Sequence, residues 1–154
     1  MRKAVTLMEL IVVLIIISIL SSVAVSSFKL NHLRDDTNSI YLKLLNTKYQ
    51  AGGYDKYLAN LGSIDASIGC IDLDSDKLKT TQNYKFYASV SNDSGVNILC
   101  FDMYGRTYAG EKDNNKTTFN ALISEDVNIT LSYQSKHATL SIKPQSGYIK
   151  VIYW

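Results

Sequence analysis

The chain has 154 residues, of which 16 are basic and 14 acidic, so its formal net charge is +2. This near balance excludes the strong positive field by which proteins attract nucleic acid, and nucleic-acid binding is therefore not expected. The length suits one small globular domain beside a terminal segment.

An apolar run begins close to the amino terminus. Arg2 and Lys3 precede it, Glu9 stands at its front, and no charged side chain occurs from Leu10 to Phe28. As a helix this run would cover about 28 Å, close to the hydrocarbon thickness of a bilayer. A carboxylate beside such a run either lies among lipid headgroups or marks a function. We expect residues 5–28 to form a transmembrane and assembly helix.

The start of the run carries a specific motif. The thirteen residues from Lys3 to Ile15, KAVTLMELIVVLI, combine a basic leader, a small residue, a Thr-Leu-x-Glu core and an aliphatic helix. This string resembles the amino-terminal signal of type IV pilins and pseudopilins. Two positions depart from the usual pattern of that family: Ala4 stands where Gly is common, and Val5 where Phe or Met is common.

The resemblance has several implications. Residues 1–4 would be a leader that prepilin peptidase removes between Ala4 and Val5, and the new amine of Val5 would be methylated. Glu9 would pair with that amine on a neighbouring subunit. The mature chain would cross the inner membrane once, with its globular domain in the periplasm. Its partners would be other pseudopilins or pilins through the amino-terminal helix, prepilin peptidase and membrane lipid.

Two other interpretations of this segment remain open. Ala24-Val25-Ser26 has the small-x-small form of a signal peptidase site, which would make an ordinary secreted protein beginning at Ser27. The segment could equally be an anchor that is never cut. Against secretion, the apolar stretch is longer than the usual hydrophobic region of about 7–15 residues, and Glu9 interrupts its beginning.

The helical pattern continues through residues 29–52, now on one face only. The apolar face carries Leu30, Leu33, Thr37, Ile40, Tyr41, Leu44 and Leu45, and the opposite face carries Arg34, Asp35, Asn38, Lys43 and Asn46. We expect one helix from about Val5 to Gln50, of roughly 69 Å, ending at a positive-φ stop at Gly52-Gly53. Its second half should pack against a domain.

Residues 53–154 should form a β-rich periplasmic domain. Residues 54–61 have the spacing of a short helix, and turn residues at 92–95 and 134–137 predict two hairpins, while 145–147 should link the last two strands. Short β-like runs occur at 84–90, 97–103, 127–133, 138–143 and 148–153. The expected fold is α+β, with a long amino-terminal helix packed on an antiparallel β domain.

The carboxy-terminal half also resembles a family. Residues 98–106, which end in Gly105-Arg106, and the runs 129–131, 138–142 and 147–151 resemble H-type minor pseudopilins. The resemblance implies a non-enzymatic minor pseudopilin of a type II secretion system. A minor pilin of a type IV pilus or DNA-uptake system is the alternative. DNA-binding members of that group carry a Gly-Arg-x-Arg string, whereas Gly147-Tyr148-Ile149-Lys150 lacks both arginines.

Cys70 and Cys100 invite a disulfide, because the domain would lie in an oxidising compartment. Closing a loop of about 30 residues should stabilise the fold by roughly 3–4 kcal/mol. Since both cysteines stand in apolar runs, two buried free thiols are the alternative.

Other polar residues give weaker signals. Asp72, Asp74 and Asp76 alternate like the start of a calcium loop, but Lys77 stands where such a loop needs Gly, and a solvated acidic turn is the better interpretation. His32 and His137, the two histidines, lack partners at metal-ligand spacing, so no metal site is expected. No catalytic triad, phosphate loop or zinc motif is visible in the sequence, which favours a structural protein without cofactors over an enzyme.

Two Asn-x-Thr sequences follow an acidic residue, at Asn115 and Asn128. Their extended form resembles the bacterial N-glycosylation sequon. Asn115 lies in a charged loop and is the candidate acceptor, whereas Asn128 lies in an expected strand and is attributed to chance.

Overall fold

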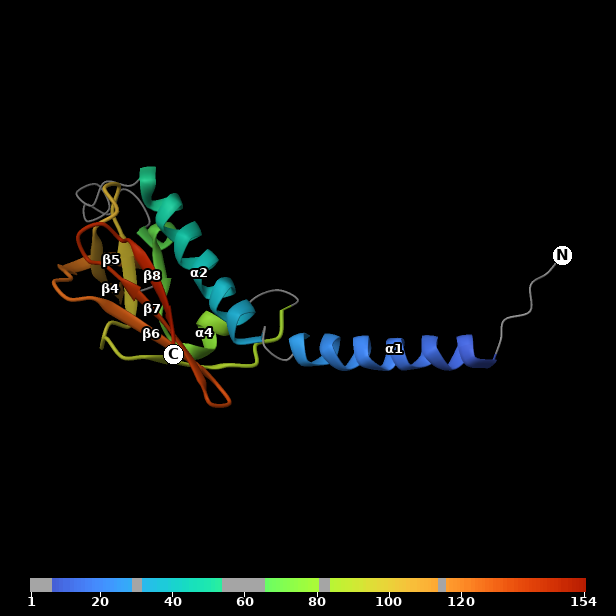
Figure 1. Ribbon diagram of the computed structural model, residues 1–154. Coiled ribbons are helices and arrows are strands. Elements are labelled where there is room, and N and C mark those ends of the chain that lie inside the picture. The colour runs from blue at the N-terminus through green and yellow to red at the C-terminus, as the bar shows by residue number, and fades with distance from the viewer. Residues whose placement is uncertain (1–6, 29–31, 54–65, 81–83, 114–115) are drawn as a thin grey trace. The chain divides into compact units, whose positions relative to one another are not determined.

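A computed structural model describes residues 7–28, 32–53, 66–80, 84–113 and 116–154, with side chains of the first helix described as far as residue 22. The chain divides into two units, Met1–Asn31 and His32–Trp154, and each is considered by itself (Figure 1).

The first unit contains helix α1, Leu7–Phe28, which confirms the expected amino-terminal helix. Its described side chains are all exposed within the unit, and they are apolar apart from Glu9, Ser18 and the adjacent pair Ser21 and Ser22. The Ser18 and Ser21 hydroxyls donate to the carbonyls of Ile15 and Ile17, at 2.8 and 2.7 Å, so these polar groups are satisfied along the helix. Among the described residues, there is no helix long and apolar enough to span a membrane.

The second unit begins with helix α2, His32–Gln50. Its buried residues recur every three or four positions, which confirms the predicted one-sided helix: Leu33, Asp36, Thr37, Ile40, Leu44 and Thr47. Whether α1 and α2 form one continuous helix lies outside the described residues, because residues 29–31 separate them.

The positive-φ stop predicted at Gly52-Gly53 is wrong, although the helix does end just before these residues. A 3₁₀ turn, η1 (Ala51–Gly53), follows α2 directly, and neither Gly52 nor Gly53 has a positive φ. The last carbonyls of a helix need hydrogen-bond donors, and a 3₁₀ turn can supply them without a residue in the left-handed conformation.

Eight strands form two four-stranded antiparallel sheets, which confirms the α+β class (Figure 1). The first sheet has the order β1-β3-β4-β5, with β1 (Cys70–Asp72), β3 (Ile98–Phe101), β4 (Thr107–Asp113) and β5 (Lys116–Leu122). The second has the order β2-β6-β7-β8, with β2 (Ser89–Asn92), β6 (Val127–Tyr133), β7 (Lys136–Ile142) and β8 (Ile149–Tyr153). Two short helices, η2 (Ala66–Gly69) and α4 (Ser75–Lys79), flank β1.

Helix α2 lies against strands of both sheets, β6 and β7 in one and β1 and β3 in the other. The main core is therefore shared by the helix and both sheets, and its largest fully buried members include Ile40, Leu44, Leu99, Phe101, Ile129, Leu131, Leu140 and Ile142. A second, smaller cluster contains Cys100, Tyr108 and Phe119. Because neighbouring strand residues face opposite ways, Leu99 and Phe101 enter the main core while Cys100 enters the second cluster.

Three strand and turn predictions need correction. The strand expected at 84–90 begins only at Ser89, and strands β1, β4 and β5 were not predicted. The turn at 92–95 does not make a hairpin, because β2 pairs with β6 while β3 pairs with β1 and β4. The hairpin at 134–137 is confirmed but is tighter, with Tyr133 opposite Lys136 and Gln134 at φ 56°. The short helix expected at 54–61 lies outside the described residues.

Candidate functional sites

The predicted processing residues lie at the edge of what the structure describes. Ala4 and Val5 fall outside the described residues, whereas Glu9 stands in the first turn of α1. A carboxylate in this position is favoured by the partial positive charge of the helix amino terminus. Leu7 and Met8 beside it are largely exposed within the unit, so the carboxylate stands on a surface of apolar side chains.

The predicted disulfide is confirmed, and the alternative of two free thiols is wrong. Cys70 and Cys100 lie directly opposite each other in the β1–β3 pair and are joined by an S–S bond. Tyr108 and Phe119 pack beside the bridge in the second cluster, with their rings 5.5 Å apart and edge to face. Gly110 completes this arrangement, because a Cβ there would lie 2.7 Å from the Cys100 sulfur.

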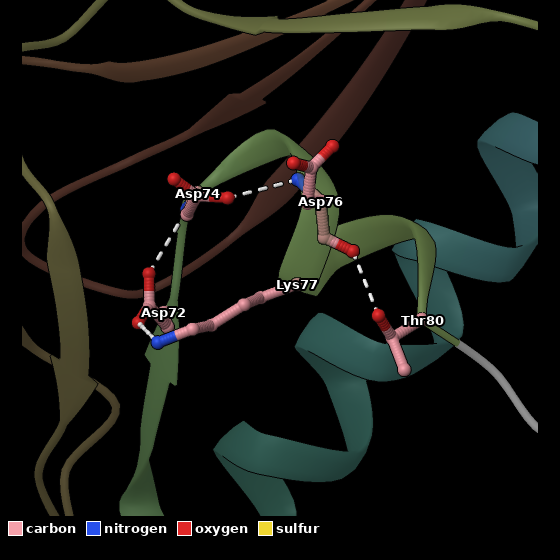
Figure 2. A network of polar contacts seen from close by, with 5 residues as sticks. All are labelled: Asp72, Asp74, Asp76, Lys77 and Thr80. Carbon is pink, nitrogen blue, oxygen red and sulfur yellow. Dashed lines mark hydrogen bonds and ion pairs between the residues drawn. The ribbon is translucent and has the colours of Figure 1, made fainter.

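The three alternating aspartates form a local turn and do not converge (Figure 2). Asp72 accepts hydrogen bonds from the Asp74 amide at 3.0 Å and the Lys77 ammonium at 2.6 Å. Asp74 caps α4 by accepting from the Asp76 amide at 2.9 Å, and Asp74 and Asp76 are exposed. These contacts support the predicted acidic turn. Among the described residues, no group of three His, Cys, Asp or Glu side chains could hold a metal ion.

The charge of Lys77 changes how this turn titrates. Burial raises the pKa of the Asp72 carboxyl, but the hydrogen bonds from Lys77 and the Asp74 amide, with the positive charge of Lys77, outweigh it and leave the pKa below its ordinary value. The same pair raises the pKa of Lys77. A shallow hollow of about 220 Å³ lies beside this pair and the disulfide.

The most deeply buried charged residue was not singled out from the sequence. Asp36 of α2 is fully buried and accepts three hydrogen bonds: from the Tyr84 hydroxyl at 2.6 Å, the Tyr87 amide at 2.9 Å and the Ala88 amide at 2.6 Å. Burial, and then the hydrogen bond to Asp36, raise the pKa of Tyr84. The only sequence signal for this site was an acidic residue on the apolar face of a helix, at the spacing of Leu33 and Ile40.

Two lysines of α2 make further contacts with the rest of the domain. Lys43, expected on the solvent face, donates instead to the carbonyls of Leu78 and Thr80, both at 2.6 Å, and so satisfies the end of α4. Burial lowers its pKa. Lys48 donates to the carbonyls of Ser146 at 2.8 Å and Gly147 at 3.1 Å.

The Gly-Arg sequence at the end of the 98–106 run forms a closed turn. Buried Asp102 accepts from the backbone amides of Tyr104 and Arg106 at 2.9 and 2.8 Å, and from the Arg106 side chain at 2.7 Å. The hydrogen bond to Asp102 raises the pKa of Arg106. Gly105 has φ 79°, which explains why glycine stands there. The guanidinium also lies 5.1 Å from the centre of the Tyr104 ring.

The two histidines contact aromatic rings. The His32 ring centre lies 4.2 Å from that of Tyr87 and 5.8 Å from that of Tyr133. His137 stacks on Trp154 at 4.5 Å, and its Nδ1 lies 2.8 Å from the Ser132 hydroxyl. Their surroundings are therefore those of packed aromatic groups, and a metal role gains no support from them.

Of the two glycosylation sequences, Asn115 falls outside the described residues, between β4 and β5, and its modification stays a prediction. Asn128 lies in β6, which pairs on both sides with β2 and β7. No protein-family profile, curated protein or solved structure matches this chain.

Proposed function

We propose that this chain is a non-enzymatic minor pseudopilin of a type II secretion system, processed and N-methylated by prepilin peptidase. It is anchored once in the inner membrane, carries its globular domain in the periplasm and joins other pseudopilins through α1. The observation that carries the proposal is the sequence Lys3-Ala4-Val5-Thr6-Leu7-Met8-Glu9 at the start of an apolar helix. A second helix with one buried face on an antiparallel β domain follows it, as that family implies.

The surface of α1 supports a role in assembly. A helix that is apolar on all sides is stable only when lipid or other apolar helices cover it. Within such a bundle an isolated carboxylate is costly, and so is an isolated ammonium, while a pair neutralises both. Cleavage after Ala4 creates an ammonium at Val5, so processing supplies a cation that can pair with Glu9 of the next subunit.

Features of the globular domain favour the secretion role over DNA uptake. The Cys70–Cys100 bridge suits an oxidising compartment, in which both roles would place the domain, so the distinction depends on the basic residues. Arg106, the arginine of the Gly-Arg turn, is held by Asp102 within the domain. A guanidinium held in this way is less available to a phosphate, and the net charge of +2 adds little attraction for DNA.

Intact mass and amino-terminal sequencing of the membrane fraction test the processing step. We expect a chain that begins at a methylated Val5. Ala4→Gly, which restores the usual family residue, should be cut at least as completely, whereas Ala4→Lys should accumulate the full-length chain. A mature terminus at Ser27 would replace the proposal with ordinary secretion.

Co-purification with other pseudopilins tests the assembly step. Glu9→Leu should leave membrane association intact, because it removes a charge from an apolar helix, but it should reduce recovery with partner subunits whose amines are left unpaired. Ser18→Leu is the matched control, since it adds a similar apolar side chain to α1 without touching the carboxylate. Equal recovery of both variants would contradict the proposed pairing.

A further inference from the structure

Strand β8 lies at an open edge of the second sheet. It pairs with β7 on one side, and among the described elements its main contacts are with β7 alone. The other edge strands are protected: β5 lies against η2, β2 lies against α4, and β1 has only three residues. Because an open edge presents backbone groups that can bind another strand, proteins commonly cover or shorten their edges. Within the described part of the chain, β8 has neither protection.

The backbone groups of three β8 residues face this open side. His137 and Trp154 exchange two backbone hydrogen bonds, at 2.9 and 3.0 Å, and the bonding of an antiparallel pair alternates from there along the strands. Ile152 and Lys150 therefore bond to β7 in the same way as Trp154. The residues between them turn their backbone groups away from β7: Ile149, Val151 and Tyr153. Their amides and carbonyls are available to another strand.

The side chains of β8 also differ from those of the other strands in its sheet. On the face opposite the main core, the described residues of β2, β6 and β7 are polar: Ser89, Ser91, Asn128, Thr130, Ser132, His137, Thr139 and Ser141. On the same face, β8 and its flanking residues carry large exposed side chains: Tyr148, Lys150, Ile152 and Trp154. Polar residues suit a face that lies in water, whereas an aromatic and aliphatic strip along an open edge indicates a surface that a partner covers.

We propose that β8 pairs with β8 of a second copy of this chain, antiparallel about a two-fold axis at Val151. The strand is nearly symmetric about this residue, with Ile149 and Tyr153 two positions away and the aromatic residues Tyr148 and Trp154 three positions away. Antiparallel pairing centred on Val151 places each of the three outward residues opposite an outward residue of the other copy, so that all their amides and carbonyls find partners. Such a two-fold contact requires a strand that is complementary to itself. The inference goes beyond the proposed secretion role and depends neither on it nor on the position of α1.

The side chains that this register brings together are compatible. Tyr148, which is 61% exposed, would lie opposite Trp154, which is 69% exposed, and pairs of aromatic residues across strands are favourable. Lys150 is the single charged residue of β8 and would lie opposite Ile152, so no like charges face each other directly. The two lysines would meet only on the diagonal, at about 7–8 Å. A second copy therefore supplies from the same sequence every pairing that the open edge requires.

Cross-linking of two cysteine variants tests this pairing. Full-length chains that carry Tyr148→Cys or Trp154→Cys are purified in detergent and treated with a short thiol-specific cross-linker, each alone and as an equal mixture. The native Cys70 and Cys100 are joined to each other, so they do not react. In the proposed dimer position 148 of one copy lies opposite position 154 of the other, whereas the two copies of either position lie roughly 20 Å apart along the paired strands. Each variant alone is therefore the matched control for the mixture, and association through α1 would link all three samples alike.

We expect the mixture to give at least about five-fold more covalent dimer than either variant alone, because only the mixture brings two thiols within reach. Adding Val151→Lys to both chains places two ammonium groups opposite each other on the axis and should remove most of the link, while Val151→Thr should keep it. Val151 is half-buried at the edge, and the urea midpoint of each variant shows that its domain remains folded. A mixture that links no better than the single variants at any protein concentration would overturn the proposal, as would a link that Val151→Lys leaves unchanged. A Trp154→Cys chain that links in cells only to a different protein would overturn the second copy as the occupant.

Discussion

Removing the buried carboxylate of Asp36 is the sharpest test of how the globular unit is held together. Asp36→Ala leaves the amides of Tyr87 and Ala88 without the acceptor that they share, and it frees the Tyr84 hydroxyl. A buried donor left unsatisfied costs about 1–3 kcal/mol, so the two amides together with the lost side chain should lower the free energy of unfolding by about 3–5 kcal/mol. That is a large part of the roughly 5–15 kcal/mol that stabilises a typical domain.

Two milder variants separate the carboxylate's contacts. Asp36→Asn should cost about 1–2 kcal/mol, because its amide oxygen can still accept both backbone amides while its NH₂ donates to the Tyr84 oxygen. Tyr84→Phe should cost a similar amount and leave the amide contacts intact. The double variant Asp36→Ala with Tyr84→Phe should cost less than the sum of the two single changes, because both remove the same hydrogen bond.

Urea unfolding of the detergent-solubilised chain measures these free energies, and native-state hydrogen exchange reports on the two amides. Tyr87 and Ala88 should lose exchange protection in Asp36→Ala and keep it in Tyr84→Phe. An Asp36→Ala variant within about 1 kcal/mol of the unmodified chain, with both amides still protected, would refute the account of Asp36 as the anchor of this segment.

Three further outcomes follow from named contacts. Gly110→Ala should destabilise the domain by about 1–3 kcal/mol, since its Cβ would lie 2.7 Å from the Cys100 sulfur, whereas Gly52→Ala meets nothing within 4 Å and should be neutral in the same urea titration. Replacing Cys70 and Cys100 together by Ser should cost about 3–4 kcal/mol, and an unchanged unfolding midpoint would contradict the role of the bridge. Burial, and then the hydrogen bond to the Asp36 carboxylate, raise the pKa of Tyr84. The contribution of the neutral Tyr84 hydroxyl to stability is therefore complete below a pH of about 10 and falls as the pH rises above that value. When the free energy of unfolding is measured against pH, Tyr84→Phe should show a smaller loss of stability at alkaline pH than the unmodified chain.

Helix α2 and the last three strands, β6, β7 and β8, were predictable because their periodicity is strong. Alternating residues of β6, such as Ile129 and Leu131, are buried, and the helical spacing of Leu33, Ile40 and Leu44 matches the face that α2 buries. Each of these elements buries one face in the main core, so the spacing of its apolar residues in the sequence matches its burial pattern.

The first sheet was harder to predict because its side chains are divided between the main core and the small disulfide cluster. Strand β4 contains Gly110, Glu111 and Lys112, and its buried aromatic residue, Tyr108, faces the small disulfide cluster and not the main core. Strand β1 has only three residues. The turn at 92–95 was recognisable from its residues, and Asn92 does bond to Val96 and Ser94 within it, but turn chemistry does not reveal which strands pair on either side.

The site at Asp36 was unpredictable for a different reason. Its partners lie 48 to 52 residues away in a segment without regular structure, so no local pattern connects them. An isolated acidic residue on an apolar helix face indicates that some partner exists, because a buried charge must be paired or hydrogen-bonded. Which partner it finds is decided only when the chain folds.

The polar contacts of α2 have a common consequence for how this helix can move against the β domain. Asp36 holds the 84–88 segment near the start of α2, Lys43 holds the end of α4 near its middle, and Lys48 holds the 145–147 turn near its end. Apolar packing alone resists separation of a helix from a sheet but permits sliding, since it is non-directional. Hydrogen bonds at three points along the helix have fixed geometry and oppose such sliding. A displacement of α2 along its axis would therefore break all three, so axial movement of the helix should carry the β domain with it.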